Sequence, residues 1–302
     1  MKLLNYQRGT MPRPGLALSD TVGLDLLACQ PSLPGNLHLM LPDLASVRTI
    51  FAEFAPRAAE IAARWEKGIA PTLPHFDLRQ ARLLTPVILP SKIIAVGLNY
   101  HDHAEEQNKR LPQRPLLFAK APSCLQAPEL PIELPADATQ VDAEAELAVI
   151  IGKPGRGITR RQAPEHIAGF TCMNDVSDRE AQYSDKQFFR GKSMDTGGPC
   201  GPWLVTTDEL PPLASGLAIT CHWNDKLMQS SNTDNLIFPV DELISYISRT
   251  MTLLPGDIIT TGTPGGVGVF RDPPVFLQPG DTVTVTIEGI GSLSNPVVRR
   301  ED

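Results

Sequence analysis

The distribution of apolar and polar residues divides the chain into two regions. From residue 91 onward, short apolar segments separated by Gly and Pro are typical of strands. The final one alternates Val and Ile with Thr, as expected for a strand with one buried face. We therefore expect a mainly β core, with strands at 92–98, 145–152, 216–223, 257–262 and 281–289.

One helix is predicted within this region, over residues 241–254, with Asp241 as its N-cap and Pro255-Gly256 as its stop. The first part of the chain mixes strand and helix patterns. Two short strands surround a turn at Ser19 and Asp20, and Pro56 must kink a helical segment or begin a second helix. The apolar positions with helical spacing are Ile50, Phe51, Phe54, Ile61, Ala62 and Trp65, then Leu243, Ile244, Ile247 and Met251.

These patterns predict a small α+β domain over residues 1–75 and a larger domain over 76–302. Gly68 is expected to end the second N-terminal helix, and the Pro-rich span around 71–90 is expected to link the domains.

The net charge of the chain argues against two classes of binding partner. The chain carries a formal charge of −7 and has no run of Lys and Arg, so nucleic acid and anionic membranes are not expected partners. No stretch has the length of a membrane span, and the N-terminus has no apolar core of a secretory signal. The five cysteines are scattered without a C-x-x-C pair, which favours free thiols and a cytoplasmic location.

The segment VDAEAELAVIIG carries the most specific signal. In a strand, Asp142, Glu144 and Glu146 share one face and lead directly into apolar positions. Like charges in such a place are costly unless a cation neutralises them, and Mg²⁺ or Mn²⁺ suits carboxylate ligands. An edge strand with two solvated glutamates is the alternative. A third carboxylate would favour the metal, and Asp175, at the end of an apolar run, is a better candidate than Asp178.

Five segments occur in order along the chain: GLNYHDHAEE, VDAEAELAVIIGK, NDVSDREAQ, GKSMDTGGPCGPWLVT and LLPGDIITTGTPGGVG. Together they resemble the fumarylacetoacetate hydrolase superfamily, especially its fumarylacetoacetate hydrolase-domain branch. The resemblance runs from about residue 90 to the C-terminus. It implies a mixed β-sandwich or β-roll catalytic domain, a homodimer, and one Mg²⁺ or Mn²⁺ ion on Glu144, Glu146 and Asp175. Asn99 and Tyr100 stand where founding members have a fourth carboxylate, so a three-carboxylate site is expected.

A histidine and a glutamate three residues apart, His103 and Glu106, can meet on one helical turn. Taken alone they would read as a surface pair, but the resemblance implies a dyad in which Glu106 orients His103 as general base. His101 and Glu105 are weaker candidates.

Lys192 lies in GKS, but Lys186 stands where a phosphate-binding loop needs glycine. The resemblance instead implies that Lys192 stabilises charge on a substrate oxygen. Four residues are candidates for substrate contact. The resemblance implies this role for Arg179 and Gln182, although Arg179 could pair with Asp178 at the surface. The glycine-rich TGTPGGVG favours close backbone approach to a ligand at Thr263, although it could serve only a tight turn. These four are Tyr100, Arg179, Gln182 and Thr263.

The resulting hypothesis is metal-dependent hydrolysis of a carbon–carbon bond in an acylpyruvate-like or other diketo acid, through a metal-stabilised enolate. The substrate is then a small 2-oxo acid, with His103 activating water. The same site would suit decarboxylation or isomerisation of 2-oxo or 2-hydroxymuconate-type diacids, including oxaloacetate decarboxylation. A non-catalytic metal-stabilised scaffold is the remaining alternative. No G-x-S-x-G motif supports a serine hydrolase.

Overall fold

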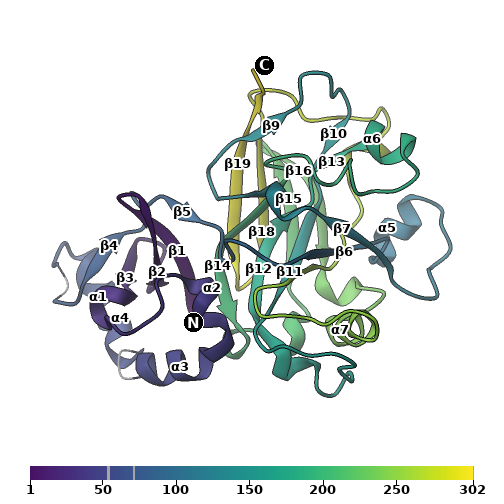
Figure 1. The fold of residues 1–302 in the computed structure, drawn as a ribbon. Helices are drawn as coiled ribbons and strands as arrows, with labels where there is room; N and C mark the ends of the chain where they lie inside the picture. Colours follow the sequence, from purple (N-terminus) through teal and green to yellow (C-terminus); the bar gives the residue numbers. More distant parts are fainter. Residues whose placement is uncertain (53–54, 71, 302) are drawn as a thin grey trace.

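The protein is mainly β with some α structure, as expected (Figure 1). The structure is a computed structural model, and it describes residues 1–52, 55–70 and 72–301. Its largest sheet has twelve strands. Ten of them follow the order β4 (His75–Asp77), β3 (Val22–Asp25), β2 (Met11–Ala17), β1 (Lys2–Arg8), β14 (Gly198–Thr206), β12 (Ile167–Asn174), β11 (Ala145–Ile151), β17 (Ile258–Thr260), β6 (Ile93–Gly97) and β7 (Leu116–Lys120). The other two are β5 (Leu83–Leu84), beside β1, and β8 (Leu125–Gln126), beside β14.

A second sheet packs on the first and completes the β-sandwich. Its order is β16 (Lys226–Asn232), β15 (Ala218–Trp223), β18 (Thr282–Ile287), β19 (Gly291–Arg299) and β9 (Ile132–Leu134). A short pair joins β10 (Val141–Asp142) to β13 (Ser177–Asp178). The helices are α1 (Leu26–Cys29), α2 (Leu37–Met40), α3 (Leu44–Ala52), α4 (Ala55–Glu66), α5 (His101–Glu106), α6 (Arg179–Ser184) and α7 (Val240–Ser248).

All five strands predicted from apolar patterning are present, as β6, β11, β15, β17 and β18. Along β18 the Val and Ile side chains are buried and the Thr side chains are half-buried, which is the predicted alternation. Every residue of β11 is buried, because each face of this strand meets a different core. Leu147 and Val149 pack in the core shared with the second sheet, whereas Ala148 and Ile150 face the N-terminal helices.

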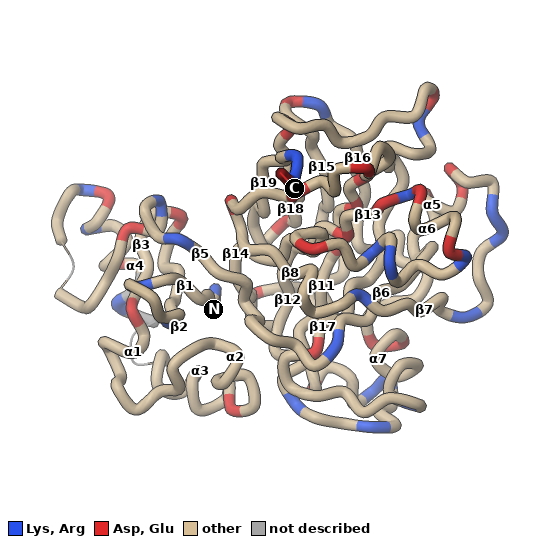
Figure 2. Tube along the Cα trace, turned by 45° about the horizontal axis from the view of Figure 1, so that its top comes forward, with Lys and Arg blue, Asp and Glu red and all other residues tan. Residues whose placement is uncertain are grey.

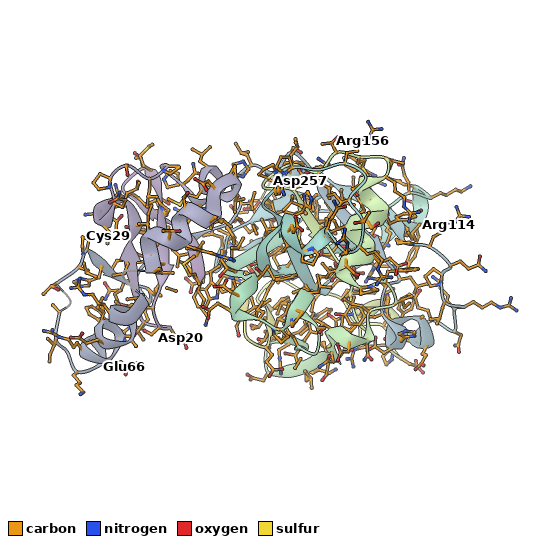
Figure 3. All side chains as sticks on the ribbon, turned by 90° about the horizontal axis from the view of Figure 1, so that it is seen from below. Asp20, Cys29, Glu66, Arg114, Arg156 and Asp257 are labelled. Carbon is orange, nitrogen blue, oxygen red and sulfur yellow. The ribbon has the colours of Figure 1, made fainter. Side chains whose placement is uncertain are left out.

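The N-terminal unit is joined to the rest by both a sheet and a core. Strand β1 pairs with β14, and side chains from α2 and α3, such as Leu37 and Phe51, belong to the same buried cluster as Ile150 of β11. The predicted boundary at residue 75 falls at the first residue of β4, and β5 beyond it still pairs with β1. The expected linker at 71–90 therefore contains two strands. Figure 3 shows Cys29 and Glu66 of this unit far from Arg114, at the other end of the molecule.

Two details of the predicted helices need correction. Helix α7 begins after Pro239 rather than Asp241, and it ends at Ser248, so Met251 lies beyond it. Asp241 instead occupies the first helical turn, where its negative charge interacts favourably with the positive end of the helix dipole. Its carboxylate also accepts a hydrogen bond from Arg160 at 2.8 Å.

In the N-terminal unit, Pro56 lies in the first turn of α4, which confirms a second helix, and Gly68 follows that helix with a positive φ of 74°. Phe54 falls outside the described residues.

All five cysteines are free thiols, four of them buried. Within the described residues, none of the helices has the length and apolar character needed to cross a membrane.

Strand polarity places the functional segments at one edge of the large sheet. Strands β17 and β6 are parallel, so both end at this edge and lead into Thr263 and α5 respectively. Strand β11 is antiparallel to β17 and starts at the same edge, and its neighbour β12 ends there. Residues that are far apart in the sequence, from 101 to 263, therefore meet at one place.

Candidate active site

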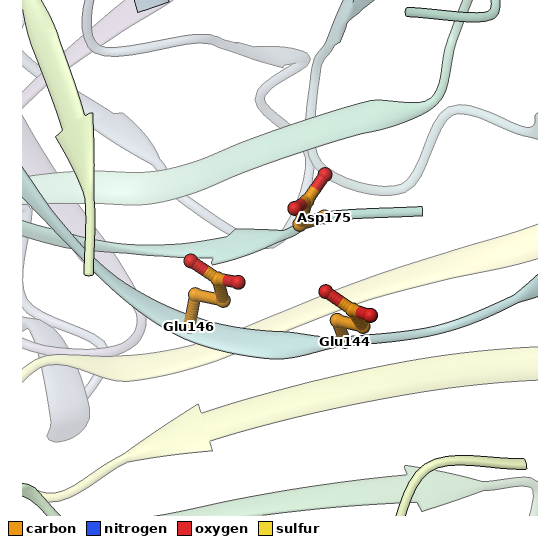
Figure 4. A group of neighbouring side chains, drawn as sticks. All are labelled: Glu144, Glu146 and Asp175. Carbon is orange, nitrogen blue, oxygen red and sulfur yellow. The ribbon is translucent and has the colours of Figure 1, made fainter. Parts of the chain in front are cut away.

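Three buried carboxylates converge where β11 begins and β12 ends (Figure 4). Glu144 and Glu146 flank the first residue of β11, and Asp175 directly follows β12. The strands are held in register here, because the Asp175 amide donates to the Glu144 carbonyl at 2.9 Å. One carboxylate oxygen from each residue lies within 4.8 Å of the others. The sheet ladder thus brings the predicted third carboxylate to the predicted pair.

The electrostatics of this cluster suit a divalent cation. Burial, together with the charges of Asp175 and Glu144, raises the pKa of Glu146 well above its ordinary value. Burial also opposes ionisation of Glu144, but Lys192 and Arg179 outweigh it and hold the pKa of Glu144 at about 2. A hard cation would relieve the repulsion at Glu146, and three carboxylate oxygens are the ligands that such a cation prefers. The residues present therefore fit a metal ion.

Two buried lysines neutralise part of the cluster. Lys192, predicted from the resemblance, lies with its Nζ 2.5 Å from Glu144 and 2.7 Å from Asp175. Lys120 lies 2.7 Å from the other oxygen of Asp175 and donates to the carbonyl of Gly197. The sequence does not predict a role for Lys120, because a lysine at the end of an apolar strand is ordinarily exposed to solvent.

Arg179 is held by carboxylates rather than left open at the surface. Its Nη2 and Nε atoms bind Asp142 at 2.6 and 3.0 Å, and its Nη1 binds Glu144 at 2.7 Å and Gln182 at 3.0 Å. The alternative pairing with Asp178 is not seen. Asp142 also accepts the amides of Gly268 and Val269, so one carboxylate anchors both the guanidinium and the loop that follows β17.

Replacing Asp142 with alanine is expected to destabilise the metal-free protein by about 3–5 kcal/mol, because the buried Arg179 charge loses its main partner. Urea unfolding monitored by circular dichroism measures this change. Asp185→Ala serves as the matched control, since it breaks an aspartate–arginine pair at the surface, with Arg190. Equal and small effects of both substitutions would contradict the structural role of Asp142.

Helix α5 presents the predicted dyad to the same site. His103 is buried, and its Nδ1 lies 3.1 Å from the Glu106 carboxylate. The other oxygen of Glu106 accepts the Gly266 amide at 2.8 Å, which fixes the carboxylate. Gly266 has a φ of 102°, and a Cβ there would lie 2.2 Å from the Met228 carbonyl, so this loop position requires glycine.

A glutamine that the sequence did not single out completes the histidine's surroundings. The Nε2 of Gln107 lies 2.8 Å from the Nε2 of His103. With Gln107 as donor there, the His103 proton is on Nδ1 and is donated to Glu106. His101 and Glu105, the weaker candidates, are exposed.

Glu144, Glu146, His103 and Lys192 open onto one cavity of about 130 Å³. Seven predicted residues line it: His103, Glu144, Glu146, Arg179, Gln182, Lys192 and Thr263. Asp175 lies behind Lys192, and Glu106 lies behind His103. Tyr100 is absent from the lining and is fully buried in the core, so the structure does not bring it to the cavity. The predicted hydroxyl of Thr263 is bound by Gln229 at 2.7 Å.

The remaining cavity wall is largely aromatic and apolar, and it was not predicted. It includes Leu98, Leu116, Phe118, Tyr183, Phe188 and Phe270. Such residues read as core or incidental surface positions in the sequence, because nothing in their spacing relates them to the carboxylates.

The protein belongs to the fumarylacetoacetate hydrolase family, whose C-terminal domain profile matches residues 92–298. A mitochondrial oxaloacetate tautomerase of Bos taurus is 41% identical over 303 residues, which cover 99% of this chain and 92% of the relative. The relatives include hydrolases and an oxaloacetate tautomerase, so the family to which this chain belongs is one of enzymes.

Two solved structures extend the match in three dimensions. A fumarylacetoacetate hydrolase from the psychrophilic Exiguobacterium antarcticum has a TM-score of 0.81, with 35% identity over 99% of this chain and 100% of that one. A maleylpyruvate hydrolase from Sphingobium sp. SYK-6, solved with manganese(II) and pyruvate, has a TM-score of 0.78 and 31% identity, and each chain is covered fully. The second neighbour thus binds a divalent metal ion, and the carboxylate cluster of this chain is a group that could hold one.

The cytoplasmic location expected from the cysteines is wrong in light of these comparisons, because the bovine relative, matched over 99% of this chain, is a mitochondrial protein. Free thiols indicate a reducing environment, and that property does not distinguish between compartments.

Proposed function

We propose that this protein is a metal-dependent enzyme that interconverts the keto and enol forms of oxaloacetate, with Mg²⁺ or Mn²⁺ held by Glu144, Glu146 and Asp175. The observation that carries the proposal is the buried three-carboxylate cluster at the base of a cavity that His103 also lines. The bovine relative, an oxaloacetate tautomerase, supports this isomerisation over the hydrolysis inferred first from the sequence.

The size of the cavity supports a short substrate. At about 130 Å³, it is well below the roughly 300–1,000 Å³ of pockets that enclose drug-sized ligands. A four-carbon 2-oxo diacid is consistent with such a space, and the longer muconate derivatives are less so. When bound, the cation would polarise the 2-oxo group and make the neighbouring C3–H bond more acidic.

The chain's own residues supply the proton transfers. His103 removes a proton from C3 through Nε2, because Glu106 holds the Nδ1 proton and leaves Nε2 as the basic nitrogen. Gln107 must release Nε2 for this step. The protonated imidazole then delivers the proton to the 2-oxygen. The result is a shift of one proton with no water consumed. Lys192 uses two of its three N–H groups on Glu144 and Asp175, and the third can donate to that oxygen as negative charge develops there.

A direct test follows the ultraviolet absorbance of enol-form oxaloacetate as it converts to the keto form. We expect the purified protein with Mg²⁺ or Mn²⁺ to accelerate the conversion, EDTA to abolish the acceleration, and added metal to restore it. Pyruvate and carbon dioxide are assayed in parallel, because their release would instead indicate decarboxylation. No acceleration with either metal would exclude tautomerase activity.

Hydrolysis of an acylpyruvate is the second candidate, and the geometry of the dyad favours it. A histidine whose Nδ1 is fixed by a carboxylate can activate water as readily as it removes a carbon-bound proton. The maleylpyruvate hydrolase neighbour shares the fold at 31% identity. Pyruvate release from acetylpyruvate without acceleration of oxaloacetate tautomerisation would favour this candidate.

A further inference from the structure

The charged residues around the cavity do not neutralise the two negative charges of a dianionic substrate. Glu144, Glu146, Arg179 and Lys192 line the cavity, and their ion-pair network adds Asp142, Asp175 and Lys120. The carboxylate of Glu106 binds His103. Five carboxylates therefore face three bases, an excess of two negative charges that a divalent cation would cancel. A substrate with two carboxylates brings two more negative charges, and the network has no free cation to meet them.

Each base in the network is already committed. All three guanidinium nitrogens of Arg179 bind Asp142, Glu144 or Gln182. Lys192 bridges Glu144 and Asp175, and Lys120 is fully buried against Asp175. Under the proposed function, one carboxylate of the substrate would lie beside the 2-oxo group at the carboxylate cluster, where the metal ion would bind. The distal carboxylate needs a different partner.

Three cationic side chains line the cavity: Lys109, Arg179 and Lys192. Among the described residues, Arg179 and Lys192 form ion pairs with carboxylates, whereas Lys109 forms none. It lies in the α5–β7 loop (residues 107–115), which begins immediately after the dyad. That loop contains three basic residues, Lys109, Arg110 and Arg114, and no acidic one. Figure 2 shows Lys and Arg along the segment that runs from α5 to β7, and Figure 3 shows Arg114 at the outer edge of the molecule.

We propose that Lys109 binds the distal carboxylate of the substrate and makes the enzyme selective for 2-oxo diacids over 2-oxo monoacids. The inference rests on the proposed function, since it names the group that distinguishes oxaloacetate from shorter 2-oxo acids at the same site. The flexible lysine stem suits this role, because an ammonium at the exposed side of the cavity can follow the carboxylate as it enters.

The test compares Lys109→Gln with Arg110→Gln, a matched substitution at the adjacent exposed residue, which does not line the cavity. For Lys109→Gln we expect the KM for oxaloacetate to rise about tenfold, with kcat within about twofold of wild type, as for loss of one charge-assisted contact. Arg110→Gln should behave as wild type.

A binding measurement separates this inference from the reaction itself. Calorimetry on the Mg²⁺-loaded protein compares malate with lactate, two stable hydroxy acids that differ in the distal carboxylate. We expect wild type and Arg110→Gln to bind malate about tenfold more tightly than lactate, and Lys109→Gln to lose that preference.

Unchanged KM and malate preference in Lys109→Gln would overturn the inference, as would equal binding of malate and lactate by wild type. If wild type shows no tautomerase activity but keeps a malate preference that depends on Lys109, the proposed function is wrong and the diacid site stands.

Discussion

The His103→Ala variant is expected to lose roughly 10²–10⁴-fold in kcat for oxaloacetate tautomerisation, the usual contribution of a positioned general base. His103 is the buried imidazole that lines the cavity, and Glu106 and Gln107 hold both of its nitrogens. The substitution removes no carboxylate from the metal cluster. Metal affinity, measured by calorimetry with Mn²⁺, should therefore fall far less than kcat, because all three carboxylate ligands remain in place.

His101→Ala is the control for this prediction, because His101 lies on the same short helix with its side chain exposed. It should retain full activity. If His103→Ala were as active as His101→Ala, another group would have to act as the base, and Lys192 is the cavity residue to examine next.

The Glu146→Gln variant is expected to lose metal binding and activity while its metal-free form is at least as stable as wild type. The pKa of Glu146 is raised by burial and by Asp175 and Glu144, so the ionised carboxylate costs stability when no cation is bound. Glutamine keeps an oxygen that can accept the Gly262 amide, which Glu146 accepts at 2.8 Å. Neutralisation therefore removes repulsion without losing this hydrogen bond.

The pH dependence of stability follows from the direction of this shift. A carboxyl whose pKa is raised on folding contributes its stability below the unfolded value, about 4.5 for glutamate, and loses that contribution as pH rises through the folded pKa. The metal-free wild type should thus lose more stability than Glu146→Gln between pH 5 and roughly pH 8. Added Mg²⁺ should reverse the loss in wild type alone, because mass action favours the state that binds it.

Thermal unfolding with and without Mg²⁺ at both pH values measures these differences. Glu105→Gln, an exposed glutamate on α5, is the control and should respond to Mg²⁺ as wild type does. A full stabilisation by Mg²⁺ in Glu146→Gln would show that the cation binds elsewhere.

Sequence motifs do not distinguish between the reactions that this type of site can perform. The motifs identify the family and point to a 2-oxo acid, and hydrolysis was the first hypothesis because the dyad can activate water. The bovine relative is an oxaloacetate tautomerase, and this supports the isomerisation that we propose. One arrangement of metal ligands and base suits both reactions, so the motif residues do not distinguish between them. The rest of the cavity wall, which comes from β7, α6 and the loops near them, is where members with the same motif residues can differ.

The sequence by itself determined the parts of the site that depend on local periodicity. Strand parity placed Glu144 and Glu146 beside buried positions, and helical spacing paired His103 with Glu106. Both relations involve residues two or three apart, whose relative direction follows from backbone geometry alone.

Only the tertiary structure decided which distant charges meet. The partner of Arg179 is Asp142, which is 37 residues away, and Lys120 reaches the segment around Lys192, which is 72 residues away. The place of Lys109 at the cavity likewise depends on how the α5–β7 loop folds over the sheet edge. Such contacts arise from strand order and loop packing, and neither leaves a period in the sequence that would mark the residues as neighbours.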